Sequence, residues 1–230
     1  MSKNRGIIYE NYIFNELLKS GLTEKKYRPA GTDKNKPDTK FKVGNTYYNL
    51  EIKYDLSADF GQGTLKYNFK DNKWFSYSEN EKMDDILKYF EIEKFADEKW
   101  KKIPNRVGKG DIGRDLRPVS KLTDIEKKED IKNFPTQYKV IKGSNPIAEY
   151  YNSKDTYYIQ IGGNLKSGFY YMGSDPANLG VPEFKPSETK IRIRNKEGRF
   201  TTAFILSINS VKKSEYEIDV NPNFILNAGR

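Results

Sequence analysis

Residues 37–53 read PDTKFKVGNTYYNLEIK, and this stretch predicts a β-hairpin. Gly44-Asn45 fits a two-residue turn with glycine first, as a type II′ turn requires. Apolar and polar residues alternate on both sides of the turn, which is the period of a half-buried strand. Counting outward from the turn gives one largely apolar face made of three opposed pairs: Val43 and Thr46, Phe41 and Tyr48, and Thr39 and Leu50.

The other face of this hairpin carries the charges. The same register opposes Lys42 to Tyr47, Lys40 to Asn49, and Asp38 to Glu51. Directly opposed residues have Cβ atoms about 4.5–5.5 Å apart, so the register that buries the apolar face also sets two carboxylates side by side. Lys53 lies two residues after Glu51 and therefore points to the same face.

The opposed acids suggest a metal site. Like charges directly opposite each other destabilise a strand pair, so stability gives no reason for Asp38 to face Glu51. Mg²⁺ takes oxygen ligands and is often held by one or two carboxylates together with a phosphate. We therefore expect these acids to hold Mg²⁺, with Mn²⁺ as a substitute, and Lys53 to donate to a phosphate or an attacking water. The alternative is a surface hairpin on which the three residues coincide.

Pro37-Asp38, twelve intervening residues and Glu51-Ile52-Lys53 resemble the signature of the PD-(D/E)xK nucleases, a restriction-endonuclease-like superfamily. The resemblance directly covers about residues 5–70. It implies an α/β fold with a mixed central sheet flanked by helices. It also implies Mg²⁺-dependent hydrolysis of phosphodiester bonds, in which Asp38 and Glu51 bind the metal, Ile52 lends its backbone carbonyl and Lys53 is catalytic.

Two more residues are candidates for the same site. An N-terminal helix in this superfamily often carries a glutamate of the metal shell, and Glu10 loosely matches it within a helix predicted over residues 6–20. Polar residues soon after the ExK element often complete the site, which points to Gln62. The alternatives are a solvated acid on an amphipathic helix and a glutamine that marks a β-bulge.

Composition limits the available chemistry. The 230 residues include no Cys and no His, which excludes disulfides, thiolate zinc sites, Cys nucleophiles and Ser-His-Asp triads. Carboxylate, lysine, tyrosine and serine chemistry remains, with hard metals favoured over zinc. No run reaches the length of a membrane span and no signal-peptide pattern is present, so we expect a cytoplasmic protein.

The net charge of +9, from 41 basic against 32 acidic residues, favours a polyanionic partner, and we expect double-stranded DNA. A lysine-rich proteome is the alternative explanation. The basic residues that we predict to contact DNA lie near the hairpin, in a glycine-rich segment over 104–118 and along a late strand: Lys36, Lys66, Arg106, Lys109, Arg114, Arg117, Lys190, Arg192 and Arg194. Each of these groups is also compatible with an ordinary solvated surface.

The remaining patterns predict further helices and strands. Helices are expected over residues 83–103, 122–134 and 145–151, the second with Thr123 as N-cap and Glu126 completing a capping box. Strands are expected over residues 64–69, 74–77, 157–161 and 169–172, and a hairpin over 190–194 and 199–209. We expect one nuclease domain over residues 1–230, with a possible helical insertion at 80–150 and a β-rich last third.

The predicted function is a Mg²⁺-dependent endodeoxyribonuclease, sequence-specific in the manner of type II restriction enzymes. A homodimer would present two sites to the two strands of DNA. A phage homing, recombination or junction-resolving nuclease would share the same residues. The sequence is also compatible with a non-catalytic nucleic-acid-binding protein and with an RNA-directed nuclease, the latter because tyrosines can stack on unpaired bases.

Overall fold

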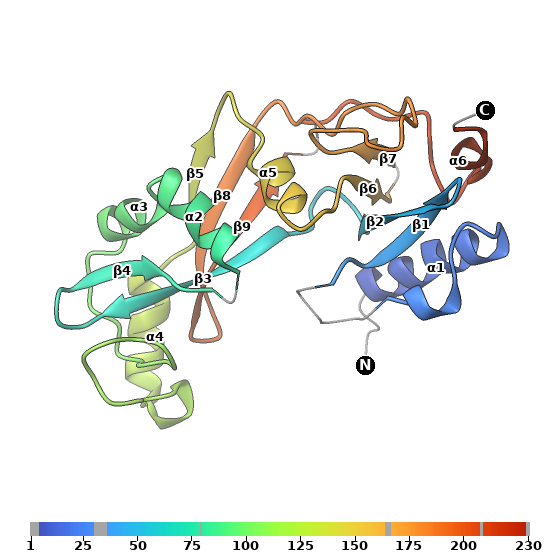
Figure 1. Cartoon of the computed structure of the whole chain (residues 1–230). Coiled ribbons are helices and arrows are strands. Elements are labelled where there is room, and N and C mark those ends of the chain that lie inside the picture. Colours follow the sequence, from blue (N-terminus) through green and yellow to red (C-terminus); the bar gives the residue numbers. More distant parts are fainter. Residues whose placement is uncertain (1–4, 30–35, 79, 164–166, 208, 229–230) are drawn as a thin grey trace. The chain divides into compact units, whose positions relative to one another are not determined.

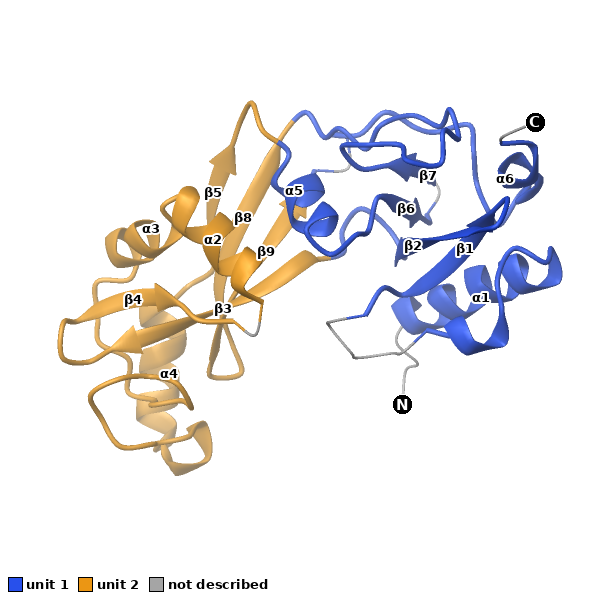
Figure 2. Ribbon diagram, in the orientation of Figure 1, with its two compact units in different colours: residues 1–58, 145–187, 206–230 blue, residues 59–144, 188–205 orange. Residues whose placement is uncertain are grey.

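The computed structural model describes residues 5–29, 36–78, 80–163, 167–207 and 209–228. Contacts between residues divide the chain into two compact units, shown in different colours in Figure 2. Unit 1 comprises residues 1–58, 145–187 and 206–230, and unit 2 comprises residues 59–144 and 188–205. The single-domain organisation with an insertion at 80–150 stays a prediction.

Unit 1 is built on a four-stranded mixed sheet in the order β1-β2-β6-β7 (Figure 1). The predicted hairpin supplies β1 (Thr39–Val43) and β2 (Thr46–Lys53), which pair in antiparallel fashion. On its other edge β2 runs parallel to β6 (Tyr158–Ile161), and β6 pairs antiparallel with β7 (Gly168–Tyr171). The hairpin is therefore attached to the rest of the sheet through β2.

The register of the hairpin is the predicted one. Val43 pairs with Thr46, and Thr39 pairs with Leu50. Gly44 has a φ of +57°, which a type II′ turn requires at its first position and which glycine adopts without steric cost. The alternation of the sequence and the turn residue thus specify one pairing of the two strands.

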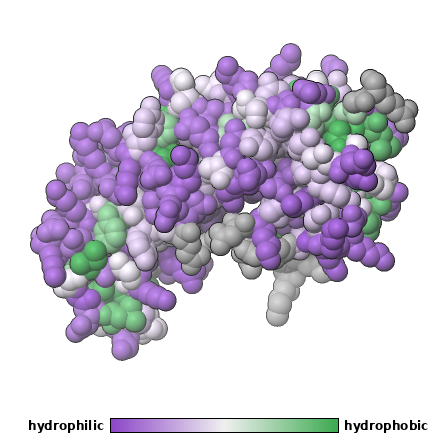
Figure 3. All heavy atoms as spheres, viewed as in Figure 1, coloured by the Kyte–Doolittle hydropathy of each residue, from purple (hydrophilic) through white to green (hydrophobic). Residues whose placement is uncertain are grey.

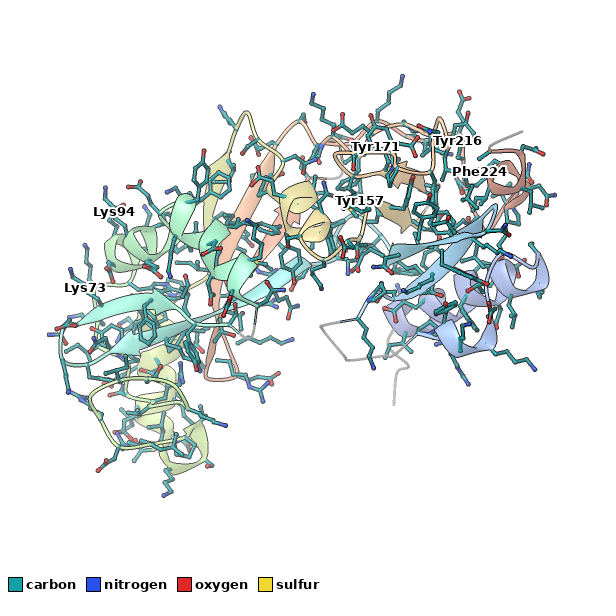
Figure 4. All side chains as sticks on the ribbon, in the orientation of Figure 1. Lys73, Lys94, Tyr157, Tyr171, Tyr216 and Phe224 are labelled. Carbon is teal, nitrogen blue, oxygen red and sulfur yellow. The ribbon has the colours of Figure 1, made fainter. Side chains whose placement is uncertain are left out.

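Helices and aromatic side chains complete unit 1. The predicted N-terminal helix is α1 (Arg5–Lys19), and two shorter helices, α5 (Pro146–Asn152) and α6 (Asn223–Asn227), follow later in the chain. The core combines buried residues of α1 and α6 with the apolar face of the sheet: Ile13, Leu17, Phe41, Leu50, Ile52, Tyr158, Phe169 and Ile225. Partly buried aromatic residues pack against this core, including four that Figure 4 labels: Tyr157, Tyr171, Tyr216 and Phe224.

Unit 2 is built on a five-stranded sheet in the order β4-β3-β9-β8-β5. Its strands are β3 (Phe60–Asn68), β4 (Lys73–Ser76), β5 (Gln137–Ile141), β8 (Thr189–Lys196) and β9 (Arg199–Leu206). The pairs β3–β4, β3–β9 and β5–β8 are antiparallel. Both hairpins predicted here are present, whereas β5 had no prediction.

The stretch predicted as one helix over residues 83–103 forms two, and that prediction is wrong. The two helices are α2 (Glu81–Tyr89) and α3 (Ile92–Lys99). Glu91 lies between them with a φ of +52°, a left-handed conformation that an α-helix interior does not accept. Each helix buries its own apolar face, so the continuous hydrophobic stripe of the sequence is compatible with the break.

The third helix of unit 2, α4 (Asp124–Asn133), begins as predicted. The side chain of Thr123 accepts a hydrogen bond from the Glu126 N–H, and the Glu126 side chain accepts one from the Thr123 N–H, which completes the capping box. Arg117 adds an ion pair to Glu126 at 2.7 Å. Backbone and side-chain donors to its carboxylate lower the pKa of Glu126 to about 2.

The fold class is α/β, with a mixed sheet and flanking helices, as predicted, although the chain forms two sheets instead of one. The last third is rich in strands, from β6 to β9. None of the helices in the described part of the chain is long and apolar enough to cross a membrane. The face drawn in Figure 3 is mostly hydrophilic, in keeping with a charged-residue content of 32%.

An aromatic cluster forms the core of unit 2. Trp74 lies 4.5 Å from Phe200 and 5.0 Å from Trp100 between ring centroids, and Phe134 lies 5.1 Å from Phe200. Most of these contacts have the edge-to-face geometry that aromatic rings favour. All four rings are buried, and Phe200 is fully so.

We expect Phe200→Ala to lower the free energy of unfolding of unit 2 by about 3–5 kcal/mol, because it leaves a cavity among rings that cannot collapse into it. Both tryptophans of the chain lie in this cluster, so their fluorescence during urea unfolding reports on this unit. Leu116→Ala is the control, since Leu116 is 60% exposed, and it should change stability by less than about 0.5 kcal/mol. Equal effects of the two substitutions would contradict this assignment of the core.

Candidate active site

The structure brings Asp38, Glu51 and Lys53 together in unit 1. Thr39 is opposite Leu50, so Asp38 comes opposite Glu51 just outside the first strand. The Asp38 carboxylate accepts a hydrogen bond of 2.7 Å from the backbone N–H of Ile52. Lys53 Nζ forms an ion pair with Glu51 Oε1. The three side chains therefore meet at the end of the hairpin away from its turn.

The backbone of Ile52 faces the same place. The N–H and C=O of one residue in a strand point to the same side, so the Ile52 carbonyl faces the Asp38 side of β2. The next carbonyl, that of Lys53, points the other way and accepts a hydrogen bond of 2.8 Å from Gly162 N–H. Ile52 is thus able to offer a carbonyl oxygen beside the carboxylates, as the superfamily resemblance implied.

Tyr151 is a member of this site that the sequence did not indicate. Its hydroxyl donates a hydrogen bond of 2.9 Å to Glu51 Oε1, and the side chain is 2% exposed. Tyr151 comes from α5, which begins at Pro146 after the Asn145 side chain caps the helix by accepting from Ala148 N–H. The sequence predicts this helix, but nothing local places it against a strand 100 residues earlier.

Burial and like charge work against the ionised acids. Burial raises the pKa of Asp38 well above its usual range, and the negative charge of Glu51 raises it further, although Lys53 opposes both. For Lys53, burial favours the neutral form, but the neighbouring carboxylates outweigh this and its pKa is raised. The site therefore holds two opposed acids, of which Asp38 takes up a proton more readily than usual, beside a lysine that keeps its proton.

Glu10 lies on α1 and belongs to the same electrostatic group. Burial raises the pKa of Glu10, while Lys53 lowers it and Glu51 raises it. Its Oε2 atom is buried and has no hydrogen-bond partner within the described residues. A buried carboxylate oxygen without a donor is costly, so a positive charge beside Glu10 would lower the free energy of the site.

The oxygen atoms of this site suit a hard cation that takes only a few of its ligands from the protein. Over the described residues, no group of three or more carboxylates is arranged to hold a metal ion. Two carboxylates and one carbonyl remain, from Asp38, Glu51 and Ile52. Mg²⁺ is commonly bound by one or two carboxylates and completes its shell with water and substrate phosphate, so these residues fit it.

Gln62 belongs to unit 2, where it is exposed and donates a hydrogen bond of 3.1 Å to Asp59. The pairing of β3 with β9 shifts register between Phe60 and Gln62, and Gly61 has a φ of +71°. The β-bulge alternative therefore describes its local structure. The catalytic role of Gln62 stays a prediction.

The basic face of β8 is present, but its cations are paired. Ile191 and Ile193 are fully buried, so Lys190, Arg192 and Arg194 share the other face. Their positive charge is met by two acids: Asp59 pairs with Arg192 at 2.7 Å and with Arg194 at 3.1 Å, and Glu188 pairs with Lys190 at 3.1 Å. The two arginine side chains are only 14% and 24% exposed. This strand face is therefore less open to DNA than the sequence suggested.

Arg106, one of the residues predicted to contact DNA, is buried in unit 2. The residue is 5% exposed, pairs with Asp111 at 3.4 Å and lies 4.4 Å from the Phe200 ring centroid. The Arg106 guanidinium therefore makes its contacts with Asp111 and Phe200 inside unit 2.

The other basic residues of the predicted DNA surface have individual partners in unit 2. The Arg117 side chain pairs with Glu126, Arg114 lies 4.5 Å from the Phe69 ring centroid, and Lys66 donates to the Lys109 carbonyl. In unit 1, Lys36 is exposed just before Pro37. Contact of these residues with DNA stays a prediction.

We expect Asp38→Asn, measured in EDTA, to raise the free energy of unfolding near pH 7 by about 0.5–2 kcal/mol. Because the pKa of Asp38 is raised, the folded protein binds a proton on the Asp38 carboxyl group more tightly than the unfolded chain does. The charge therefore costs stability at neutral pH, and the cost disappears as the pH falls toward the unfolded pKa of about 3.9.

The measurement is urea unfolding followed by circular dichroism at several pH values. The gain of Asp38→Asn over the wild type should shrink as the pH falls, and Glu98→Gln, at an exposed position, should show no such trend. A variant that is less stable than the wild type at pH 7 would contradict the unfavourable electrostatics of the site.

Comparisons with known proteins add little to this geometry. No protein-family model and no curated protein matches the chain. Among solved structures, HhaI endonuclease in complex with DNA is similar to this chain, with 13% sequence identity and a TM-score of 0.41. The match covers 85% of this chain and 84% of that one. At this TM-score we draw no conclusion from the similarity.

Proposed function

We propose that this protein is a Mg²⁺-dependent nuclease that hydrolyses phosphodiester bonds in DNA. The observation that carries the proposal is the meeting of Asp38, Glu51 and Lys53 on one face of the hairpin. Folding gains nothing from opposed carboxylates in a half-buried site, and a cation would turn their repulsion into attraction. The PD-(D/E)xK resemblance of residues 37–53 points to the same chemistry.

In this proposal Asp38, Glu51 and the Ile52 carbonyl would hold the metal, and Glu10 is a second-tier member of the site that adds negative charge near Glu51 and Lys53. When bound, Mg²⁺ lowers the pKa of a water and polarises the phosphoryl oxygens. The carboxylates are preorganised for this task, because the Ile52 N–H holds Asp38 while Tyr151 and Lys53 hold Glu51 Oε1.

Lys53 acts as a donor in this mechanism. Neighbouring carboxylates raise its pKa, so the side chain keeps its proton and is suited to orient a water or to donate to a phosphate oxygen. Removal of a proton from the attacking water is then a task for another base.

The finer assignments are also proposals. We propose that the enzyme cuts duplex DNA internally, acts as a homodimer and recognises a specific sequence. Discrete bands from digestion of a mixed-sequence plasmid would favour a restriction or homing role, whereas cutting confined to branched DNA would favour junction resolution. An RNA-directed nuclease would cleave RNA in the same buffer.

We expect Asp38→Ala, Glu51→Ala and Lys53→Ala each to reduce Mg²⁺-dependent plasmid cleavage by at least about 100-fold, because each removes a ligand or donor at the reacting phosphate. EDTA should abolish cleavage by the wild type. Glu98→Ala and Lys102→Ala are matched controls at exposed positions and should cut at the wild-type rate. Undiminished cleavage by all three site variants would eliminate this site.

Tyr151→Phe tests the positioning of Glu51. Loss of the hydroxyl leaves Glu51 Oε1 with Lys53 alone, and substitutions that disturb the partners of a metal ligand typically cost 10–100-fold in metal affinity or activity. We therefore expect the Mg²⁺ concentration at half-maximal cleavage to rise by about 10-fold, with the rate partly restored at high Mg²⁺. Tyr138→Phe, at a tyrosine 52% exposed, is the control. An unchanged Mg²⁺ requirement would remove Tyr151 from the site.

A further inference from the structure

A cluster of lysines and tyrosines covers the polar face of the hairpin near its turn. It comprises Lys40 and Lys42 of β1, Tyr47 of β2, and Lys26 and Tyr27 of the preceding turn (Lys25–Tyr27), and we call it the Lys–Tyr track. The Tyr27 and Tyr47 rings lie 4.9 Å apart between centroids with an interplanar angle of 50°. Both tyrosines are half-buried, so each ring keeps part of its surface in solvent.

The lysines surround these two rings. Lys26 Nζ lies 5.0 Å from the Tyr27 centroid, Lys40 Nζ lies 5.5 Å from the same centroid, and Lys42 Nζ lies 6.0 Å from that of Tyr47. One acid, Glu24, pairs with Lys26 at 2.8 Å and accepts a hydrogen bond from the Tyr47 hydroxyl.

Two of these cations lack an ion-paired acid within the described residues. Lys40 and Lys42 have no ion pair in the parts of the chain that the structure describes. Three lysines gathered around two rings repel one another, so the stability of the hairpin does not account for them. A bound polyanion would account for them, because its negative charges would offset this repulsion.

The hairpin residues of the track and the carboxylates of the site follow one another along the same face of the hairpin. Alternate residues of a strand share a face, so the face that presents Lys42 and then Lys40 presents Asp38 next. At about 3.3 Å per residue the Cα atoms of Lys42 and Asp38 are about 13 Å apart. The hairpin residues of the track and the carboxylates of the proposed cleavage site therefore lie on the same face of the hairpin.

We propose that the Lys–Tyr track binds an unpaired segment of the nucleic-acid substrate and delivers it to Asp38 and Glu51. Tyr27 and Tyr47 stack on bases while the lysines bind phosphates, the combination that single-strand-binding surfaces use. Stacking on a side chain requires a base whose face is free, and in a duplex neighbouring base pairs cover those faces. The delivery step rests on the proposed function and refines its substrate to duplex DNA that carries a single-stranded segment beside the scissile phosphate.

Binding is measured in EDTA, where no cleavage occurs, by fluorescence anisotropy with a labelled single strand of about 16 nucleotides and the matching blunt duplex. The test variant is the double substitution Tyr27→Leu with Tyr47→Leu, which keeps apolar packing and removes stacking. Tyr47→Phe keeps the ring, and Tyr138→Leu is a matched substitution at an exposed tyrosine of unit 2. Circular dichroism confirms that each variant is folded.

We expect the double leucine variant to bind the single strand about 10- to 100-fold more weakly and the duplex nearly as well as the wild type does. Tyr47→Phe and Tyr138→Leu should bind both as the wild type does. Lys40→Gln with Lys42→Gln should weaken both and reduce the salt slope for the single strand by about 1.4. Wild-type binding of the single strand by the double leucine variant, or an equal loss on both DNAs, would overturn the proposal.

A cleavage assay separates this inference from the proposed function. With Mg²⁺ and a duplex carrying a single-stranded arm, the double leucine variant should show a raised KM and an unchanged kcat, since it keeps the carboxylates. If the wild type cuts no DNA while the leucine variant still loses single-strand binding, the nuclease assignment fails and the track stands as a binding site. If the wild type cuts and the leucine variant matches it in KM, delivery by the track is refuted.

Discussion

The pairing of β1 with β2 in one register is the constraint on which the rest of the site depends. Burying Phe41 and Leu50 on one face obliges Asp38 and Glu51 to meet on the other, because side chains alternate along a strand. A slip of one residue would relieve the repulsion but would also turn the whole apolar face outward. The core of unit 1 thus supplies the free energy that holds two like charges together.

Several contacts make this unfavourable pair tolerable. Ile52 N–H donates to Asp38, and Lys53 and Tyr151 both donate to Glu51 Oε1. These donors offset only part of the repulsion, since the pKa of Asp38 remains raised by burial and by its neighbour. The remaining repulsion is unfavourable for folding, and a positive charge beside the two acids would reduce it, which is consistent with the proposed metal binding.

Net charge alone is a poor guide to where a polyanion binds. Three arginines of unit 2 make internal contacts: Arg106 lies against Phe200, and Arg192 and Arg194 share Asp59. Lys40 and Lys42 of the hairpin form no ion pair within the described residues and lie near the Tyr27 and Tyr47 rings instead. This difference follows from chemistry, because a planar guanidinium suits buried pairs and ring faces whereas an ammonium is kept near water.

The sequence by itself determined what depends on neighbours along the chain. It predicts the hairpin and its turn, the capped start of α4, the α/β class and the meeting of Asp38, Glu51 and Lys53, because alternation and turn chemistry act over a few residues. It misses the break at Glu91, since two short helices and one long helix share the same periodicity.

Only the tertiary structure decided the contacts between residues that are far apart in the sequence. Parallel pairing of β2 with β6 and the packing of α5 bring Tyr151 to Glu51 across 100 residues, and the fold of unit 2 buries Arg106. Two parallel strands are joined by a long crossover connection, and no local sequence pattern identifies which two strands will pair. Which charges are buried likewise depends on surfaces that meet only after folding, so the sequence shows the charges and the tertiary structure decides which of them reach solvent.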